Sequence, residues 1–232
     1  MLKQKILISG CGLSWSGQER KVWTNILRVA GANIVDVGGP AVSNQWILDQ
    51  AFLALLDDNT ITDAVIQLTS LGKLDVEVDT VRELSLVNPD SIRNFTYQGV
   101  WPSSASQEHL SKKLWYEYLY SPSLEVQELF CKTMLIDNWC TVHNINLIVV
   151  QGYNIPWTDE QLEFVKDKIY NLDSSIWNNY EKSKYYVVEE GNTVPRLGFQ
   201  FELIKELIPL ISPNLIDKIN YIREQYDRSN NN

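Results

Sequence analysis

The chain has 232 residues, of which 44% are hydrophobic, and its formal net charge is −9. This length suits one large α/β domain, and the apolar content is enough for a sizeable core, outside the range of disordered proteins. Acidic and basic residues are interspersed without a basic stripe, which disfavours nucleic acid as a partner. No apolar run reaches about 18 residues, so we expect no membrane insertion. The first residues lack a long apolar stretch with a small-residue cleavage site, so we expect no signal peptide.

Short apolar runs alternate along the chain with stretches of helical periodicity. The runs predict buried strands over 5–9, 33–37, 63–68, 146–150 and a short last strand over 184–188. The periodic stretches predict helices over 18–30, 43–56, 106–120, 122–139, 195–211 and 213–226, with another that starts at 159. This alternation implies a parallel sheet with helices on both faces.

Helix ends carry recognisable capping residues. Gly31 is expected to end the first helix, Ser43 or Asn44 to cap the second, and Thr158 to start the helix at 159 through a capping box. Leu55 and Leu56 are both expected on the buried face of the second helix. The stretch over about 72–103 is interpreted as an irregular insertion, and the tail over 227–232 as frayed. Residues 1–232 are expected to form a single domain.

Metal and cofactor chemistry finds little support. Cys11, Cys131 and Cys140 have no metal-ligand spacing, and His109 and His143 are the two histidines of the sequence. We therefore expect reduced, mostly buried thiols and no zinc site. An acidic stretch is interpreted as a solvated loop, without the spacing of a calcium loop: Glu77, Asp79, Glu83 and Asp90. No cofactor is expected.

Three segments, in this order, resemble the conserved blocks of the SGNH (GDSL) hydrolases, in particular the short SGNH-like proteins of phages and large viruses. Ile6–Ser14 stands where the family has a strand and Gly-Asp-Ser-Leu, Val37–Ile47 where it has Gly-x-Ser-Asn, and Val65–Ser70 where it has Gly-x-Asn-Asp. Val194–Phe199 lies where the family carries Asp-x-x-His-Pro. The resemblance implies a three-layer α/β/α fold with a parallel, flavodoxin-like sheet. Ligands of such folds bind beyond the carboxyl ends of the strands, here after Ser9, Val37, Leu68 and Val150.

The same resemblance implies a site without its catalytic side chains. SGNH hydrolases use a Ser nucleophile, a His base, an Asp that orients the His, and an oxyanion hole. The matching positions carry Gly12 for Ser, Val194 for His, Gly191 or Asn192 for Asp, Ala41 for the oxyanion Gly and Thr69 for the oxyanion Asn. The backbone amide of Ala41 can still serve as a donor, but the base and its orienting acid are missing.

A displaced catalytic pair is the alternative. Cys11, Ser14 or Ser16 would act as nucleophile, with His109 as the base, in an esterase or acetylhydrolase. The simpler interpretation makes Cys11 a small buried residue and the two serines caps of the following helix. His143 precedes the strand at 146 and is expected at the opposite end of the sheet.

Tryptophans offer candidate ligand contacts. Trp15, Trp101 and Trp157 lie in predicted loops and are candidates for stacking on a glycan or for a protein interface. Other tryptophans, on apolar helix faces, are expected in the core: Trp23, Trp46 and Trp139.

The sequence thus favours a non-catalytic, phage-encoded module, either a virion structural or assembly component or a binder of a glycan or protein. Its expected place is the host cytoplasm or the virion. Homo-oligomer formation through the aromatic insertion fits this hypothesis. A nucleotide or cofactor binder is disfavoured, because Gly10-Cys11-Gly12 lacks the third glycine of a dinucleotide fingerprint and no P-loop lysine follows.

Overall fold

The structure, a computed structural model, describes residues 4–10, 23–39, 42–72, 74–77, 97–100, 120–170, 175–181 and 197–230. Its strands are β1 (Ile6–Ser9), β2 (Ile34–Asp36), β3 (Asp63–Leu68), β4 (Leu74–Glu77), β5 (Tyr97–Val100), β6 (Asn146–Gln151) and β7 (Ile169–Tyr170). Its helices are α1 (Trp23–Val29), α2 (Asn44–Asp57), α5 (Pro122–His143), α6 (Asp159–Val165), α7 (Ile176–Glu181), α8 (Leu197–Ile211), the 3₁₀ turn η4 (Pro213–Leu215) and α9 (Ile216–Asn230).

Five parallel strands form the central sheet, in the order β2-β1-β3-β6-β7. Ile6 of β1 is in register with Ile34 of β2 on one side and with Asp63 of β3 on the other. Chain order therefore reverses at β1, between β2 and β3, as in the flavodoxin-like arrangement of doubly wound sheets. The prediction of a three-layer α/β/α fold with a parallel, flavodoxin-like sheet is confirmed.

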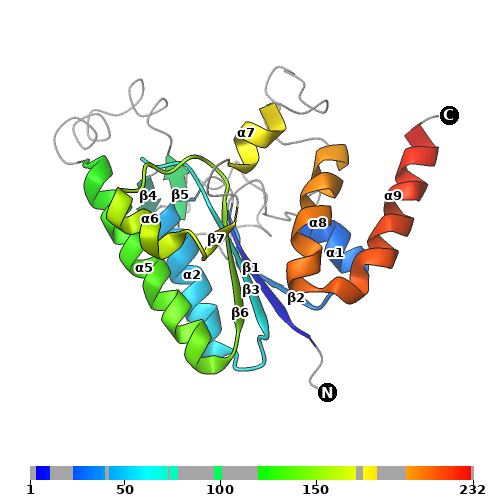
Figure 1. Cartoon of the computed structure of the whole chain (residues 1–232), viewed down its shortest axis with the longest axis horizontal. Helices are drawn as coiled ribbons and strands as arrows, with labels where there is room; N and C mark the ends of the chain where they lie inside the picture. The colour runs from blue at the N-terminus through cyan, green and yellow to red at the C-terminus, as the bar shows by residue number, and fades with distance from the viewer. Residues whose placement is uncertain are drawn as a thin grey trace.

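Side chains of the sheet alternate between two cores, one on each face. Ile6, Ile8 and Val65 pack in a core shared with α1, α7, α8 and α9. Leu7 and Ile66 point to the other face, where α2, α5 and α6 cover them. Figure 1 shows the two helical layers, with α2, α5 and α6 on one side of the sheet and α1, α8 and α9 on the other. Because both faces of the sheet are covered, consecutive residues in the middle of its strands are apolar, as in Ile6–Ile8 and Ala64–Ile66.

Several helix ends are where the capping residues predict them. Ser43 is the N-cap of α2, and its hydroxyl accepts a hydrogen bond from the backbone of Trp46 at 3.1 Å. Thr158 and Gln161 form the expected capping box of α6. Gly31 follows α1 with a positive φ of 95°, a conformation that costs glycine little.

Other elements differ from the sequence prediction. Part of the stretch interpreted as irregular forms an antiparallel pair, in which Leu74 faces Val100 and Glu77 faces Tyr97. The short elements β7 and α7 were not predicted. Helix α9 continues to Asn230 through the tail that was expected to fray, and i,i+4 ion pairs from Arg223 to Asp227 and from Glu224 to Arg228 support it. The strand predicted over 184–188, and residues 106–119 of the helix predicted over 106–120, lie outside the described residues.

Burial corrects two further expectations and confirms a third. Leu56 is exposed, although it was expected on the buried face of α2 with Leu55. Successive residues of a helix lie about 100° apart, so Leu56 is turned away from the core that Leu55 enters. Cys131 is exposed and Cys140 buried, so only one of these two thiols fits the expected burial. Trp23 is fully buried as predicted. Among the described helices, none combines the length and hydropathy that crossing a bilayer requires.

Candidate functional site

The carboxyl ends of β1, β2 and β3 meet at one edge of the sheet, and two of their loops are in backbone contact. The N–H of Gly39 donates to the carbonyl of Gly10 at 3.0 Å, and the N–H of Gly38 donates to Asp36 Oδ1 at 3.0 Å. A Cβ on Gly38 would lie 2.9 Å from the Gly10 carbonyl oxygen, so this close approach requires glycine. These contacts fix the point at which the loop after β1 begins.

Asn44 and Thr69 connect α2 to the end of β3. Asn44 Nδ2 donates to the Thr69 carbonyl at 3.0 Å, and the Thr69 N–H donates to Asn44 Oδ1 at 2.7 Å. Both residues are buried. The Asn44 side chain therefore joins the second and third blocks of the sequence, with one donated and one accepted hydrogen bond, as between two paired strands. The N–H of Thr69 has its hydrogen-bond partner within the protein.

Two serines lie beside this pair. Ser9, the last residue of β1, is buried and donates from Oγ to the Ile47 carbonyl of α2 at 2.8 Å, so its hydroxyl ties strand to helix. Ser70 follows Thr69, and its Oγ is buried without a hydrogen-bond partner. Sequence analysis did not single out Ser70. The one feature of the sequence that could have pointed to Ser70 was its position at the end of the third block.

The loop after β6 makes a second close contact at the same edge. The N–H of Gly152 donates to the Leu68 carbonyl at 2.9 Å. A Cβ on Gly152 would lie 2.3 Å from that carbonyl oxygen and 2.8 Å from Gln67 Nε2. The start of α5 is held here as well, because Glu125 Oε2 accepts from the Gly72 N–H and from the Tyr120 hydroxyl, each at 2.8 Å.

Trp157 is buried, whereas the sequence suggested a ligand contact. Its indole Nε1–H donates to Gln151 Oε1 at 3.1 Å, and its ring belongs to the core under α2 and α5. A ligand-binding role for Trp157 stays a prediction. Thr69 is described, but the other candidates of the sequence analysis lie outside the described residues: Cys11, Gly12, Ser14, Trp15, Ser16, Ala41, Trp101, His109, Asn192 and Val194.

His143 lies at the far end of the sheet from these loops, as predicted. It is the last residue of α5 and precedes β6, whose six residues separate it from the carboxyl edge by about 20 Å. Its ring stacks on Trp139, with centroids 4.2 Å apart. Cys140 lies near this end too, and burial raises the pKa of its thiol to about 11. A buried thiol with a raised pKa is a poor nucleophile.

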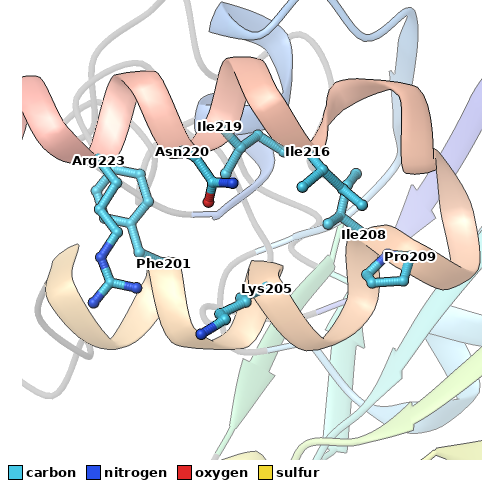
Figure 2. A pocket seen from close by; sticks show the side chains of 8 residues that line it. All are labelled: Phe201, Lys205, Ile208, Pro209, Ile216, Ile219, Asn220 and Arg223. Carbon is cyan, nitrogen blue, oxygen red and sulfur yellow. The ribbon is translucent and has the colours of Figure 1, made fainter.

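No metal cluster marks the strand ends in the described part of the chain. There, no group of three or more His, Cys, Asp or Glu side chains is placed to hold a metal ion. A cavity of about 240 Å³ does lie between the two C-terminal helices. Figure 2 shows the residues that line it: Phe201, Lys205, Ile208, Pro209, Ile216, Ile219, Asn220 and Arg223. All belong to α8 and α9, so this cavity is separate from the loops that follow the strands.

Comparison with known proteins gives similarity in structure alone. No family model and no curated protein matches the sequence. The chain is similar to TesA, with 11% identity, a TM-score of 0.47, and coverage of 90% of this chain and 99% of that one. It is similar to the psychrotrophic esterase EstA from Pseudoalteromonas sp., with 12% identity, a TM-score of 0.49, and coverage of 92% and 99%. A third similar structure, from Desulfitobacterium hafniense DCB-2, is described as lipolytic and of the G-D-S-L family, with 12% identity, a TM-score of 0.44, and coverage of 88% and 96%.

Proposed function

We propose that this chain is a non-catalytic, SGNH-hydrolase-like module that binds a protein or a glycan. The position of His143 carries the proposal. Acyl transfer by a Ser or Cys nucleophile needs a base within hydrogen-bond reach, and the sequence contains two histidines. His143 is at the amino-terminal edge of the sheet, stacked on Trp139. Only His109 is left to act as a base in a triad of the family's kind.

The hydrogen bonds at the carboxyl edge agree with this proposal. The Ser9 hydroxyl and both polar atoms of the Asn44 side chain are used between strand and helix. An oxyanion hole needs donors that point at the developing charge rather than at the protein itself. The backbone N–H of Thr69 donates to Asn44 Oδ1 instead, so this group stabilises the fold.

The biological setting proposed is a phage-encoded protein that acts in the virion or during its assembly, in the host cytoplasm. Its support is the resemblance of the three sequence blocks to phage and viral SGNH-like proteins, and fold alone does not fix function. The aromatic residues Trp15 and Trp101 are the proposed ligand contacts, because Trp15 lies in the predicted loop after the first strand and Trp101 lies in the insertion over about 72–103.

Hydrolysis assays test the catalytic part of the proposal. The full chain is incubated with p-nitrophenyl acetate and, separately, with a fluorophosphonate and a thiol-directed acyl probe. We expect no turnover above the buffer rate, no labelling by the fluorophosphonate, and only thiol labelling that is lost in Cys131→Ala. Turnover that is lost in His109→Ala and kept in the matched His143→Ala variant would overturn the proposal in favour of a displaced catalytic pair. Cys11→Ala, Ser14→Ala and Ser16→Ala would then identify the nucleophile.

Binding assays test the other part. A glycan array and pull-down with virion proteins are compared for the wild type, Trp101→Ala and Tyr221→Ala. Tyr221 is an exposed aromatic residue of α9 and serves as the control. We expect Trp101→Ala to weaken binding about tenfold and Tyr221→Ala to leave it unchanged. Equal binding by all three proteins would count against the tryptophan as an anchor.

A further inference from the structure

Helix α5 carries apolar residues on the face that is turned away from the sheet. Its buried side chains face the core: Val126, Leu129, Thr133, Ile136 and Cys140. On the opposite side Leu124 and Leu135 are each 53% exposed and Val142 is 75% exposed, with the exposed Cys131 between them. A surface helix of a globular protein normally has a polar outer face. In Figure 1, α5 is the outermost long helix of its layer, so no described helix covers this side.

The exposed residues follow the spacing of a coiled coil. We define the outer stripe as Leu124, Glu128, Cys131, Leu135, Asn138 and Val142, all of which are exposed. Their spacing alternates between four and three residues over the whole length of the helix. This is the spacing of the a and d positions that form the contact line between two paired helices. The stripe spans 18 residue steps, or about 27 Å, which is five turns of helix.

The stripe is also complementary to itself. Its members are arranged symmetrically about residue 133, so two antiparallel copies set Leu124 against Val142 of the partner subunit and Cys131 against Leu135 of the partner subunit. Glu128, the one charged member, then faces Asn138 of the partner subunit, an uncharged hydrogen-bond donor. A parallel pair would instead set Glu128 against its own copy, and like charges across a contact are destabilising.

From this spacing and charge pattern we infer that the outer stripe of α5 is a self-association surface, through which two copies of this chain pair antiparallel about a two-fold axis. A two-fold interface uses the same surface on both subunits, and the stripe meets that condition. Exposed apolar residues on flanking helices enlarge the surface: Leu53 and Leu56 on α2, and Phe164 on α6. Phe164 is in ring contact with Phe130 of α5, which places it beside the stripe.

The proposed contact has a small area, and the net negative charge of the two copies opposes it. One helix pair lies at the lower end of the size range of stable interfaces, so the dimer should dissociate on dilution. Each chain carries a net charge of −9, and the two copies repel at long range. Salt screens this repulsion and should strengthen association. The inference does not rest on the proposed function, because the mass of the particle in solution is independent of any hydrolysis or ligand binding.

Sedimentation equilibrium of the full chain, with reductant present so that Cys131 forms no disulfide, tests the surface. We expect a mass that rises reversibly with concentration from 26.7 kDa towards twice that value. Leu135→Glu should raise the dimer dissociation constant about tenfold or more. Leu210→Glu on α8 is the matched control, since Leu210 is 47% exposed, and should leave the constant unchanged. A monomer mass at every concentration, or equal effects of the two variants, overturns the inference.

A second variant tests the antiparallel arrangement. Asn138→Lys places an ammonium group opposite Glu128 of the partner subunit and should lower the dissociation constant severalfold, more so at low salt. In a parallel pair the same change sets two ammonium groups against each other and weakens association. Asn220→Lys, at an exposed position of α9, controls for the reduced net charge. Weaker association of Asn138→Lys than of this control overturns the antiparallel pairing.

Discussion

Asn44 and Thr69 are joined by two hydrogen bonds that run in opposite directions. The amide of Asn44 donates to the carbonyl of Thr69 at 3.0 Å and accepts from its N–H at 2.7 Å. The two residues are 25 positions apart and both are buried, so water cannot replace either bond. The carboxyl end of β3 is thereby fixed against the first turn of α2, at the edge where ligands of doubly wound sheets bind.

Loss of this pair should destabilise the fold strongly. Asn44→Ala leaves the N–H and the carbonyl of Thr69 buried without their side-chain partner, and each such group costs about 1–3 kcal/mol. We expect the free energy of unfolding to fall by about 2–4 kcal/mol, measured by urea denaturation with an unchanged slope.

The neighbouring residue supplies the control. Ser43→Ala removes the N-cap of α2 but no bond to β3, and should cost about 1 kcal/mol. If Asn44→Ala costs no more than Ser43→Ala, the pair with Thr69 contributes little and the tertiary role assigned to Asn44 is wrong.

The position of Gly152 should not tolerate a side chain. A Cβ at this position would lie 2.3 Å from the backbone oxygen of Leu68, which cannot move without disturbing β3. We expect Gly152→Ala to lower the free energy of unfolding by about 1–3 kcal/mol or more, as overpacking does. At Gly31 the same change meets only the flexible Lys218 Nζ, at 3.5 Å, and is limited to the strain of a positive φ of 95°.

Thermal and urea unfolding of the two alanine variants make this comparison. Strain of a left-handed residue costs about 1 kcal/mol, so the loss at Gly152 should exceed the loss at Gly31. The reverse order would mean that the loop after β6 can move away from β3, and that the edge of the sheet is looser than the contacts imply.

Short-range sequence patterns predicted the strands and helix ends that are determined by residues close together in the sequence. The apolar residues Ala64–Ile66 and Leu68 predicted a strand over 63–68, and β3 has those bounds. The capping box at Thr158 predicted the start of α6. By contrast, Ile169–Tyr170 is too short to show a period, and it is a strand because it pairs with Val149 and Val150. The pair of β4 and β5 was missed because each strand has four residues and its partner is distant in sequence.

The candidate site was predictable in location but not in its contacts. The order of strands placed it after β1, β2 and β3, where Gly10, Gly39 and Thr69 lie. Asn44 was recognised only as a possible cap, since no periodicity reveals a bond to a residue 25 positions away. Nor can periodicity tell which apolar face of α5 is buried, because Leu124 and Val126 lie on opposite sides of a helix that is apolar on both.

Alkaline pH should weaken the fold through Cys140. Burial, with the negative charge of Asp137 as the smaller cause, raises the pKa of this thiol from 9.0 to about 11. The folded protein therefore keeps a proton that the unfolded chain releases. The corresponding stability is fully present below pH 9 and is lost as the pH rises from 9 towards 11. Urea unfolding at several pH values between 8 and 10 measures it, because the contribution of Tyr170, whose pKa is raised from 10.0 to about 12, begins only near pH 10.

Two cysteine variants separate this contribution from the general effect of alkali. Stability of Cys140→Ala should fall less between pH 8 and 10 than that of the wild type, whereas Cys131→Ala, at the exposed cysteine, should follow the wild type. Parallel pH profiles for all three proteins would show that the Cys140 thiol ionises equally in the folded and unfolded states.

Trp157 should contribute to stability through its indole N–H. This group donates to Gln151 Oε1 at 3.1 Å in a buried site, and Trp157→Phe removes the donor while it keeps an aromatic ring. Trp139→Phe is the matched control, because Trp139 Nε1 is buried and has no hydrogen-bond partner. A hydrogen bond contributes about 0.5–1.5 kcal/mol, and a buried unpaired group costs more, so Trp157→Phe should lose about 1–2 kcal/mol more stability than Trp139→Phe. Urea unfolding measures this difference. Equal losses, together with weaker glycan or protein binding by Trp157→Phe alone, would assign this residue to ligand recognition instead of to the core.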